Sequence, residues 1–142
     1  MIVKDIMSRD VAWVGWEDSI EKAAQLMKQH DVGSIPVCRQ NSVIGIVTDR
    51  DIVLRSVASG QNTRQEQVSS IMSTDCTFGT PDMNVRDAAR IMSEKQIRRL
   101  PVVENNSLVG IVALGDISQE SSTQDNAEKA LKNISRPCSP QR

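Results

Sequence analysis

The sequence is poor in the residues that build catalytic and metal sites. Its 142 residues include one histidine, His30, and three cysteines, Cys38, Cys76 and Cys138, without CxxC spacing. Zinc centres and histidine-based triads need several such residues in fixed patterns, and the glycine-rich P-loop is also missing. We therefore expect no catalytic residues, no metal site and no obligatory cofactor. Cys38 lies in an apolar segment, which favours a buried, inert thiol.

The sequence also lacks an excess of charge of one sign and any long apolar run. The formal net charge is −1, which argues against nucleic-acid binding through bulk electrostatics. No apolar stretch approaches the roughly 20 residues that a membrane-spanning helix needs, and the N-terminus does not have the layout of a signal peptide. We expect a cytoplasmic protein without membrane contact, for which nucleic acid is an improbable partner.

What the sequence does contain is an internal repeat. Shifted by 65 residues, so that Val3 falls on Val68, it overlays itself without a gap. Identical residues coincide along the overlay, among them Ile6 and Ile71, Met7 and Met72, Ala23 and Ala88, Met27 and Met92, Pro36 and Pro101, and Asp51 and Asp116. The chain is therefore two copies of one supersecondary unit, and we expect neither copy to bury its apolar face alone.

Each copy predicts a helix with one apolar stripe. The stripe recurs at helical spacing, as Ile20, Ala23, Ala24 and Met27 in the first copy and as Val85, Ala88, Ala89 and Met92 in the second. Asp18, with Glu21 three residues later, is the expected N-cap of the first helix, and Asn84 that of the second. We expect His30 near the C-terminal end of the first helix.

A hairpin and a second helix follow in each copy. Residues 34–38 and 43–47 are apolar and β-branched, and they flank a polar turn. In the second copy, residues 100–103 and 108–112 flank a polar turn in the same way. A second helix is expected from Asp51 to about Ala58, before Gly60. With the short extended segment 11–14, the order is β-α-β-β-α, and the fold class is α+β.

These patterns divide the chain into four parts. We expect a first repeat at 1–60, a polar linker at 61–67, a second repeat at 68–120 and a mobile C-terminal tail at 121–142. The tail carries a possible short amphipathic helix, whose apolar residues are Ala127, Ala130, Leu131 and Ile134.

The most informative stretch runs from Gly45 to Asp51, GIVTDRD, and returns as GIVALGD from Gly110 to Asp116. Each copy predicts an apolar strand that runs into the start of a helix, where free backbone N–H groups favour an anion. The first copy adds the hydroxyl of Thr48 and the carboxylate of Asp51.

With the DIMS opening at 5–8 and the Ile35-Pro36-Val37 segment, this duplicated pattern resembles a pair of cystathionine β-synthase (CBS) domains over residues 1 to about 120. The resemblance implies a compact two-fold module that commonly forms a homodimer. It implies a regulatory module, not an enzyme, which binds AMP, ADP, ATP, S-adenosylmethionine or NAD between the repeats and acts on an effector protein that the sequence does not identify.

The resemblance also assigns residues. Asp51 and Asp116 match the family's ribose-binding aspartate, and a carboxylate has two acceptor oxygens for a cis-diol. Thr48 matches its phosphate-facing hydroxyl, and Arg98 and Arg99 match basic residues that face phosphates. One implied cleft combines Thr48 and Asp51 with Thr77, Phe78, Gly79 and Ile97. The other combines Asp116, Arg98 and Arg99 with Ala12, Trp13, Val32 and Gly33.

Each assignment has a structural alternative. Thr48 and Asp51 also fit a capping box, Arg98 and Arg99 also fit solvated surface charges, and Trp13 and Phe78 fit either adenine stacking or packing. Ala113 removes the hydroxyl from the second copy while Asp116 remains, which favours a ligand role for the aspartate. The same change, with Gly115, weakens the second cleft, so a ligand-free structural or interaction dimer is the alternative function.

Overall fold

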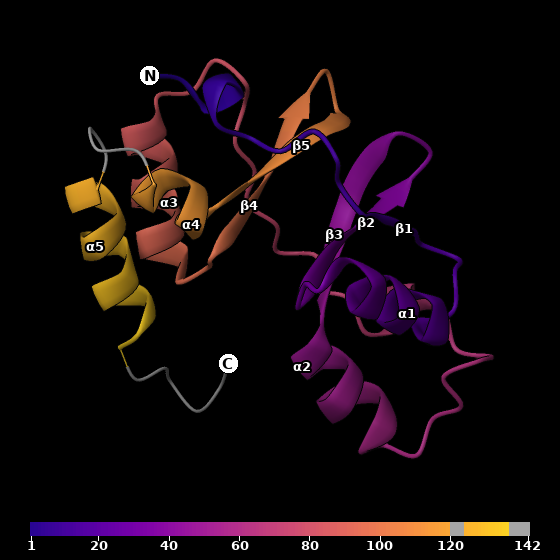
Figure 1. Ribbon diagram of the computed structural model, residues 1–142. Coiled ribbons are helices and arrows are strands. Elements are labelled where there is room, and N and C mark those ends of the chain that lie inside the picture. The colour runs from indigo at the N-terminus through magenta and orange to yellow at the C-terminus, as the bar shows by residue number, and fades with distance from the viewer. Residues whose placement is uncertain (120–123, 137–142) are drawn as a thin grey trace. The chain divides into compact units, whose positions relative to one another are not determined.

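The computed structural model describes residues 1–119 and 124–136 and divides into two compact units (Figure 1). The first-repeat unit comprises Asp10–Cys76 with Asn105–Leu108. The second-repeat unit comprises Met1–Arg9, Thr77–Glu104 and Val109–Arg142. Each is described by itself below.

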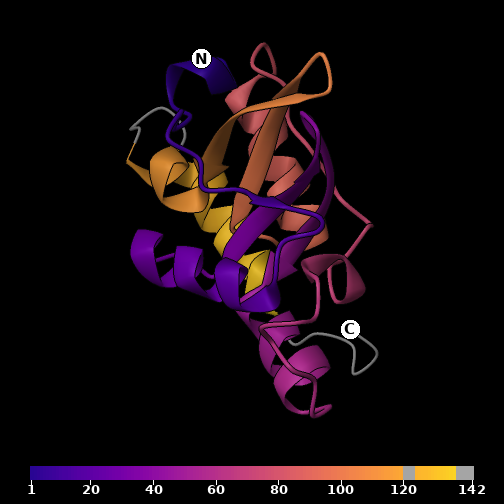
Figure 2. The same ribbon diagram turned by 90° about the vertical axis from the view of Figure 1, so that its right-hand side faces the viewer.

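The first-repeat unit is a small sheet with helices packed against it. Its elements are β1 (Val14–Gly15), α1 (Ile20–His30), β2 (Ser34–Arg39), β3 (Ser42–Thr48), α2 (Asp49–Asp51), the π-helix η2 (Ile52–Val57) and the 3-10 helix η3 (Val68–Ser70). β1 pairs with β2 in parallel, and β2 and β3 form the expected antiparallel hairpin (Figure 2). α2 and η2 are continuous, and the chain leaves them at Gly60, whose positive φ of 73° glycine adopts without steric cost.

The second-repeat unit has a similar order of elements, but its first strand is shorter and it has one additional helix. Its elements are η1 (Val3–Asp5), α3 (Val85–Lys95), β4 (Arg99–Glu104), β5 (Ser107–Ala113), α4 (Leu114–Ser118) and α5 (Gln124–Ile134). The first two residues of β5, Ser107 and Leu108, belong to the first-repeat unit. The counterpart of β1 is a single parallel bridge between Gly79 and Val102. The addition is α5, an amphipathic helix over the stretch where the sequence predicts one; Cys138 and the tail after residue 136 lie outside the described residues.

Each unit contains the opening segment of the other repeat. In the second-repeat unit, the Val3 N–H donates to Met83 O at 2.8 Å, and the side chain of Val3 is fully buried. In the first-repeat unit, the Val68 N–H donates to Asp18 O at 2.9 Å, and Val68 is equally buried. The compact units therefore do not follow the sequence repeats at their N-terminal ends.

The N-cap of α1 differs from the expectation. Ser19 caps the helix, because its side chain accepts a hydrogen bond from the Lys22 N–H at 3.1 Å. The carboxylate of Asp18 instead accepts the Gly15 N–H at 2.8 Å and closes the turn before the helix. Asp18 as N-cap was therefore wrong by one residue, whereas Asn84 caps α3 as predicted, accepting from the Arg86 N–H.

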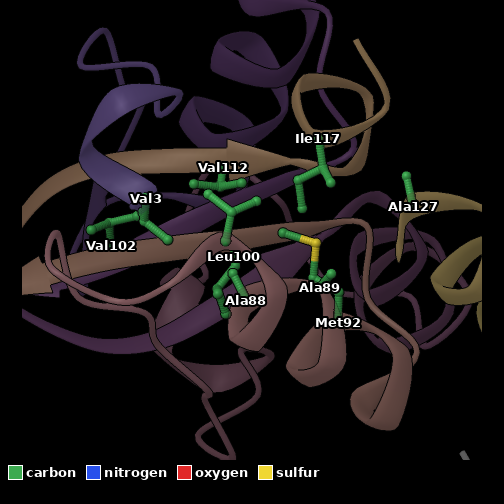
Figure 3. Packing of buried hydrophobic residues seen from close by; sticks show 10 residues of the cluster. Val3, Ala88, Ala89, Met92, Leu100, Val102, Val112, Ile117 and Ala127 are labelled. Atoms are coloured by element: carbon green, nitrogen blue, oxygen red, sulfur yellow. The ribbon is translucent and has the colours of Figure 1, made fainter. Parts of the chain in front are cut away.

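The predicted helix stripes form the cores, with one exception. Ile20, Ala23 and Met27 are buried in the first-repeat unit, but Ala24 is exposed. Its counterpart Ala89 is only 2% exposed and belongs to the core of the second-repeat unit (Figure 3). The difference has a cause in α5, which packs along α3 and α4 and adds Ala127 to that core.

Two glycines in the repeated motif are required by close packing. A Cβ on Gly110 would lie 2.7 Å from Met7 Sδ and 2.9 Å from Ser8 O. A Cβ on Gly45 would lie 2.6 Å from Met72 Sδ and 2.9 Å from Ser73 O. The Met-Ser dipeptide of each opening segment thus lies directly on the glycine of the unit that it completes, which explains why both motifs are duplicated together.

Candidate functional site

The first copy of the repeated motif forms a capping box at the start of α2. The Asp51 N–H donates to Thr48 Oγ1 at 3.0 Å, and the Thr48 N–H donates to Asp51 Oδ2 at 3.0 Å. The other carboxylate oxygen of Asp51 lies 3.7 Å from Arg55 Nε. Both side chains therefore have a structural role, and one carboxylate oxygen of Asp51 remains outside the capping bonds.

The second copy retains half of this box. The Ala113 N–H donates to Asp116 Oδ2 at 2.9 Å, while the methyl group of Ala113 accepts nothing. The hydrogen bond from the Ala113 N–H therefore explains the presence of Asp116 even though the second copy lacks the threonine hydroxyl. The argument that the loss of reciprocity favours a ligand role for Asp116 therefore loses its force, although the role itself stays a prediction.

A cavity lies beside this second copy, wholly within the second-repeat unit. Its volume is about 480 Å³. β4 and the residue before it, the β5–α4 junction and α5 supply its lining, which is Arg98, Arg99, Ala113, Leu114, Gly115, Ser118, Ala127, Glu128 and Leu131. Asp116 lies outside this lining. The cavity has the size of a small-molecule site.

The two arginines give this cavity a cationic wall. The Leu114 N–H donates to Arg98 O at 2.8 Å, which ties the start of β4 to the start of α4. Arg98 is exposed and Arg99 is half-buried. Within residues 1–119 and 124–136, neither guanidinium has an ion-pair partner. Planar guanidinium groups of this kind suit phosphate or carboxylate oxygens.

Other predicted residues of the second-repeat unit lie in its backbone framework. The Gly79 N–H donates to Pro101 O and Gly79 O accepts from the Val103 N–H, both at 2.9 Å. Thr77 and Phe78 are half-buried, and Ile97 packs against the core. Their proposed contacts with a ligand stay predictions.

The remaining predicted residues belong to the first-repeat unit. Ala12 and Val32 pack against its core, and Gly33 O accepts the Asp49 N–H at 2.9 Å. Trp13 is 53% exposed and lines a small cavity of about 130 Å³ with Cys38. Because each expected cleft draws residues from both units, its assembly stays a prediction.

Cys38 and Cys76 have the environment of structural thiols. Burial raises the pKa of the Cys38 thiol, and burial together with the Asp75 carboxylate raises the pKa of the Cys76 thiol. A raised pKa keeps both thiols protonated and unreactive at neutral pH. This agrees with the expectation for Cys38.

Sequence reasoning missed the contribution of α5 to the cavity. Ala127, Glu128 and Leu131 line it, whereas the sequence predicted only a helix at this place. The available signal was the amphipathic pattern. This pattern predicts that one face of the helix is buried, but it does not identify the part of the protein that buries it. Trp16, to which the sequence assigns no role, packs against the core of the first-repeat unit with the Arg39 guanidinium 5.1 Å from its ring centroid.

The described residues also bear on metal binding and membrane spanning. Across positions 1–119 and 124–136, His, Cys, Asp and Glu side chains do not gather in threes or more in a way that would hold a metal ion. In the same ranges, helices with the length and apolarity to cross a bilayer are absent.

Comparison with known proteins gives consistent matches over nearly the whole chain. CBS domain-containing protein YhcV of Bacillus subtilis is 50% identical over 133 residues, 94% of each chain. The crystal structure of Hypoxic Response Protein I with two coordinated zinc ions has a TM-score of 0.78 at 31% identity and covers 84% of this chain and 98% of its own. The CBS domain pair of protein MJ0100, in complex with 5'-methylthioadenosine and S-adenosyl-L-methionine, has a TM-score of 0.72 at 29% identity, covering 84% and 94%.

The family model agrees with the repeat found in the sequence. The CBS domain model matches residues 3–57 and again residues 68–123. Both copies of the glycine-containing motif lie in these ranges, as do the two opening segments that pack on the glycines. The chain therefore belongs to the CBS domain family and carries two tandem copies of that domain.

Proposed function

We propose that the chain is a regulatory module that binds an adenosine-containing ligand and transmits its bound state to another protein. The candidates are AMP, ADP, ATP, S-adenosylmethionine and NAD. The observation that carries this proposal is the cavity of the second-repeat unit, where Arg98 and Arg99 line about 480 Å³ without ion-pair partners among the described residues. The adenosine-type ligands of the MJ0100 domain pair support the same class of ligand.

In this proposal, the arginines bind the anionic groups of the ligand and the aspartates bind its ribose. Arg98 and Arg99 bind phosphate or carboxylate oxygens. Asp51 and Asp116 accept hydrogen bonds from ribose hydroxyls through the carboxylate oxygen that does not cap the helix. Thr48 lies beside Asp51 and contributes its hydroxyl to a phosphate in the first repeat. No catalytic group is part of this proposal.

The direct test is calorimetric titration of the purified chain with each of the five candidates. At a ligand concentration of 100 times Kd, binding adds about 2.7 kcal/mol to the free energy of unfolding, so Tm rises by several degrees. Arg99→Met removes one cationic group and we expect it to weaken binding of phosphorylated ligands. If none of the five ligands releases heat or shifts Tm, the proposal is wrong.

A ligand-free interaction module is the second candidate function. Ala113 and Gly115 favour it, because the second repeat lacks the hydroxyl that the first carries at Thr48. Three apolar side chains on η2 favour it as well: Val53, Leu54 and Val57 are 49–59% exposed, and an apolar patch of this kind is typical of a protein–protein contact. We propose that this face mediates a homodimer under either function.

A further inference from the structure

The cavity of the second-repeat unit has one wall that is not part of the CBS domain. The family model ends at residue 123, and α5 begins at Gln124. α5 is nevertheless fixed to the unit: Ala127 and Ala130 are at most 3% exposed. The Gln96 side chain donates to Asn133 O at 3.0 Å, and the side chain of Asn133 donates to Ser93 Oγ. α5 is therefore a built part of the cavity.

This added wall brings a negative charge to the cationic cavity. Glu128 lines the cavity with Arg98 and Arg99, and it is the acidic residue of that lining. Its carboxylate forms no ion pair with either guanidinium or with another described residue. The three groups thus line one space without neutralising one another through direct contact.

We propose that Glu128 determines which ligands the cavity accepts by their charge. The inference rests on the proposed function, because it concerns the ligand held by Arg98 and Arg99. Two guanidinium groups and one carboxylate leave about one net positive charge. A carboxylate repels each anionic group in proportion to its charge, so Glu128 opposes a triphosphate more than a monophosphate. Glu128 therefore lowers the affinity of the cavity for ATP relative to AMP, and it attracts the ammonium group of a ligand such as S-adenosylmethionine.

The test compares Glu128→Gln with the wild-type chain. AMP and ATP are titrated calorimetrically in low salt with EDTA, so that ATP keeps its full charge. We expect Glu128→Gln to tighten ATP binding about threefold to fivefold, the upper part of the range for exposed charge pairs, and AMP binding by less than about twofold. We expect Glu128→Lys to raise the affinity for ATP relative to AMP further. At about 0.5 M salt, where the Debye length is only about 4 Å, the difference shrinks.

Two further variants test whether the effect depends on the position of Glu128 or only on the net charge of the protein. Glu94→Gln makes the same chemical change on the exposed surface of α3, outside the cavity lining, and leaves the ATP-to-AMP affinity ratio at the wild-type value. In an Arg99→Met chain, the effect of Glu128→Gln on that ratio is reduced, because the two groups act on one ligand. Circular dichroism checks that each variant is folded.

Each outcome decides the inference. A raised preference for ATP in Glu128→Gln, absent in Glu94→Gln, supports it. Nucleotide binding with an unchanged ratio in Glu128→Gln and Glu128→Lys overturns it and leaves the proposed function standing. An equal change in Glu94→Gln also overturns it, since net charge would then be the cause. No binding of any nucleotide to the wild-type chain overturns both.

Discussion

Ser8 and Ile111 are joined by two backbone hydrogen bonds, from the Ser8 N–H to Ile111 O at 2.8 Å and from the Ile111 N–H to Ser8 O at 2.9 Å. Ser73 and Ile46 form the same pair in the other unit, with the same two distances. Residues 103 positions apart in one case and 27 in the other thus make equivalent contacts. The N-terminal segment is therefore a structural part of the second repeat.

We predict that shortening Val3 destabilises the second-repeat unit. Val3→Ala removes two buried methyl groups, and we expect a loss of about 1–3 kcal/mol in the free energy of unfolding. Hydrogen exchange should accelerate in α3 and β4 more than in α1 and β2. Val68→Ala is the matched control and should show the opposite distribution. Equal acceleration of both units by Val3→Ala would contradict the assignment of the opening segments.

A methyl group on the motif glycines should also be destabilising. Gly110→Ala places a Cβ 2.9 Å from Ser8 O, a backbone atom that cannot move freely. We expect a cost of about 1–3 kcal/mol from overpacking, measured by urea denaturation. Gly115→Ala is the control, because a Cβ there meets nothing within 4 Å. It lies in α4, so replacing glycine should be neutral or stabilising by up to about 1 kcal/mol.

Completing the capping box of the second repeat should raise stability. Ala113→Thr supplies the hydroxyl that Thr48 provides in the first repeat, and we expect a gain of about 0.5–1 kcal/mol. Thr48→Ala should lose a similar amount. The same substitutions test ligand binding: if a hydroxyl at this position faces a phosphate, Ala113→Thr also tightens nucleotide binding. A gain in Tm without any change in affinity would limit the hydroxyl to capping.

Asp51→Ala should affect both stability and binding. Besides its proposed contact with the ribose, Asp51 accepts the Thr48 N–H through Oδ2. We therefore expect a stability loss of about 1 kcal/mol in addition, from thermal unfolding without ligand. Asp51→Asn keeps an acceptor for that bond and is the control. Unchanged nucleotide affinity in both variants would remove Asp51 from the proposed binding residues.

The exposed face of η2 should govern association. Leu54→Glu, with Val57→Glu as a second variant, places a charge among apolar side chains that are about half exposed. We expect the dimer to dissociate to monomer in sedimentation experiments, with little change in the stability of the monomer. Ser59→Glu adds the same charge at an exposed position just after η2 and should leave the dimer intact. A wild-type chain that is already monomeric at high concentration would refute the homodimer.

Much of the fold is predictable because its signals are local. The apolar stripes predict α1 and α3, and β-branched runs around polar turns predict both hairpins. The placement of the opening segments is not predictable in this way, because it depends on contacts distant in sequence such as that of Val3 with Met83. The cap at Ser19 was missed because two adjacent residues, Asp18 and Ser19, both have side chains that can cap a helix. The local sequence does not show which of the two is already hydrogen-bonded in the preceding turn.

The candidate site was predictable to a smaller extent. The sequence places Arg98 and Arg99 at the start of a β-strand, and the structure shows that both line a cavity there, while their binding role stays a prediction. Glu128 was not foreseen, since α5 has no counterpart in the first repeat and an amphipathic pattern does not identify its partner. Asp51 and Thr48 illustrate a different limit, because a carboxylate and a hydroxyl that cap a helix are chemically the same as those that bind a ribose or a phosphate.

The exchange of opening segments has a consequence for biosynthesis. While the chain emerges from the ribosome, the first-repeat unit cannot complete its packing until Ile71 and Ser73 have left the exit tunnel. Residues 1–9 have hydrogen-bond partners at Pro81, Met83 and Ile111, so they lack these partners until those residues have been synthesised. A nascent chain halted between Cys76 and Pro81 would hold a first-repeat unit that lacks only residues 105–108, while residues 1–9 would still be without their partners. Translation order therefore makes the first-repeat unit form before the second.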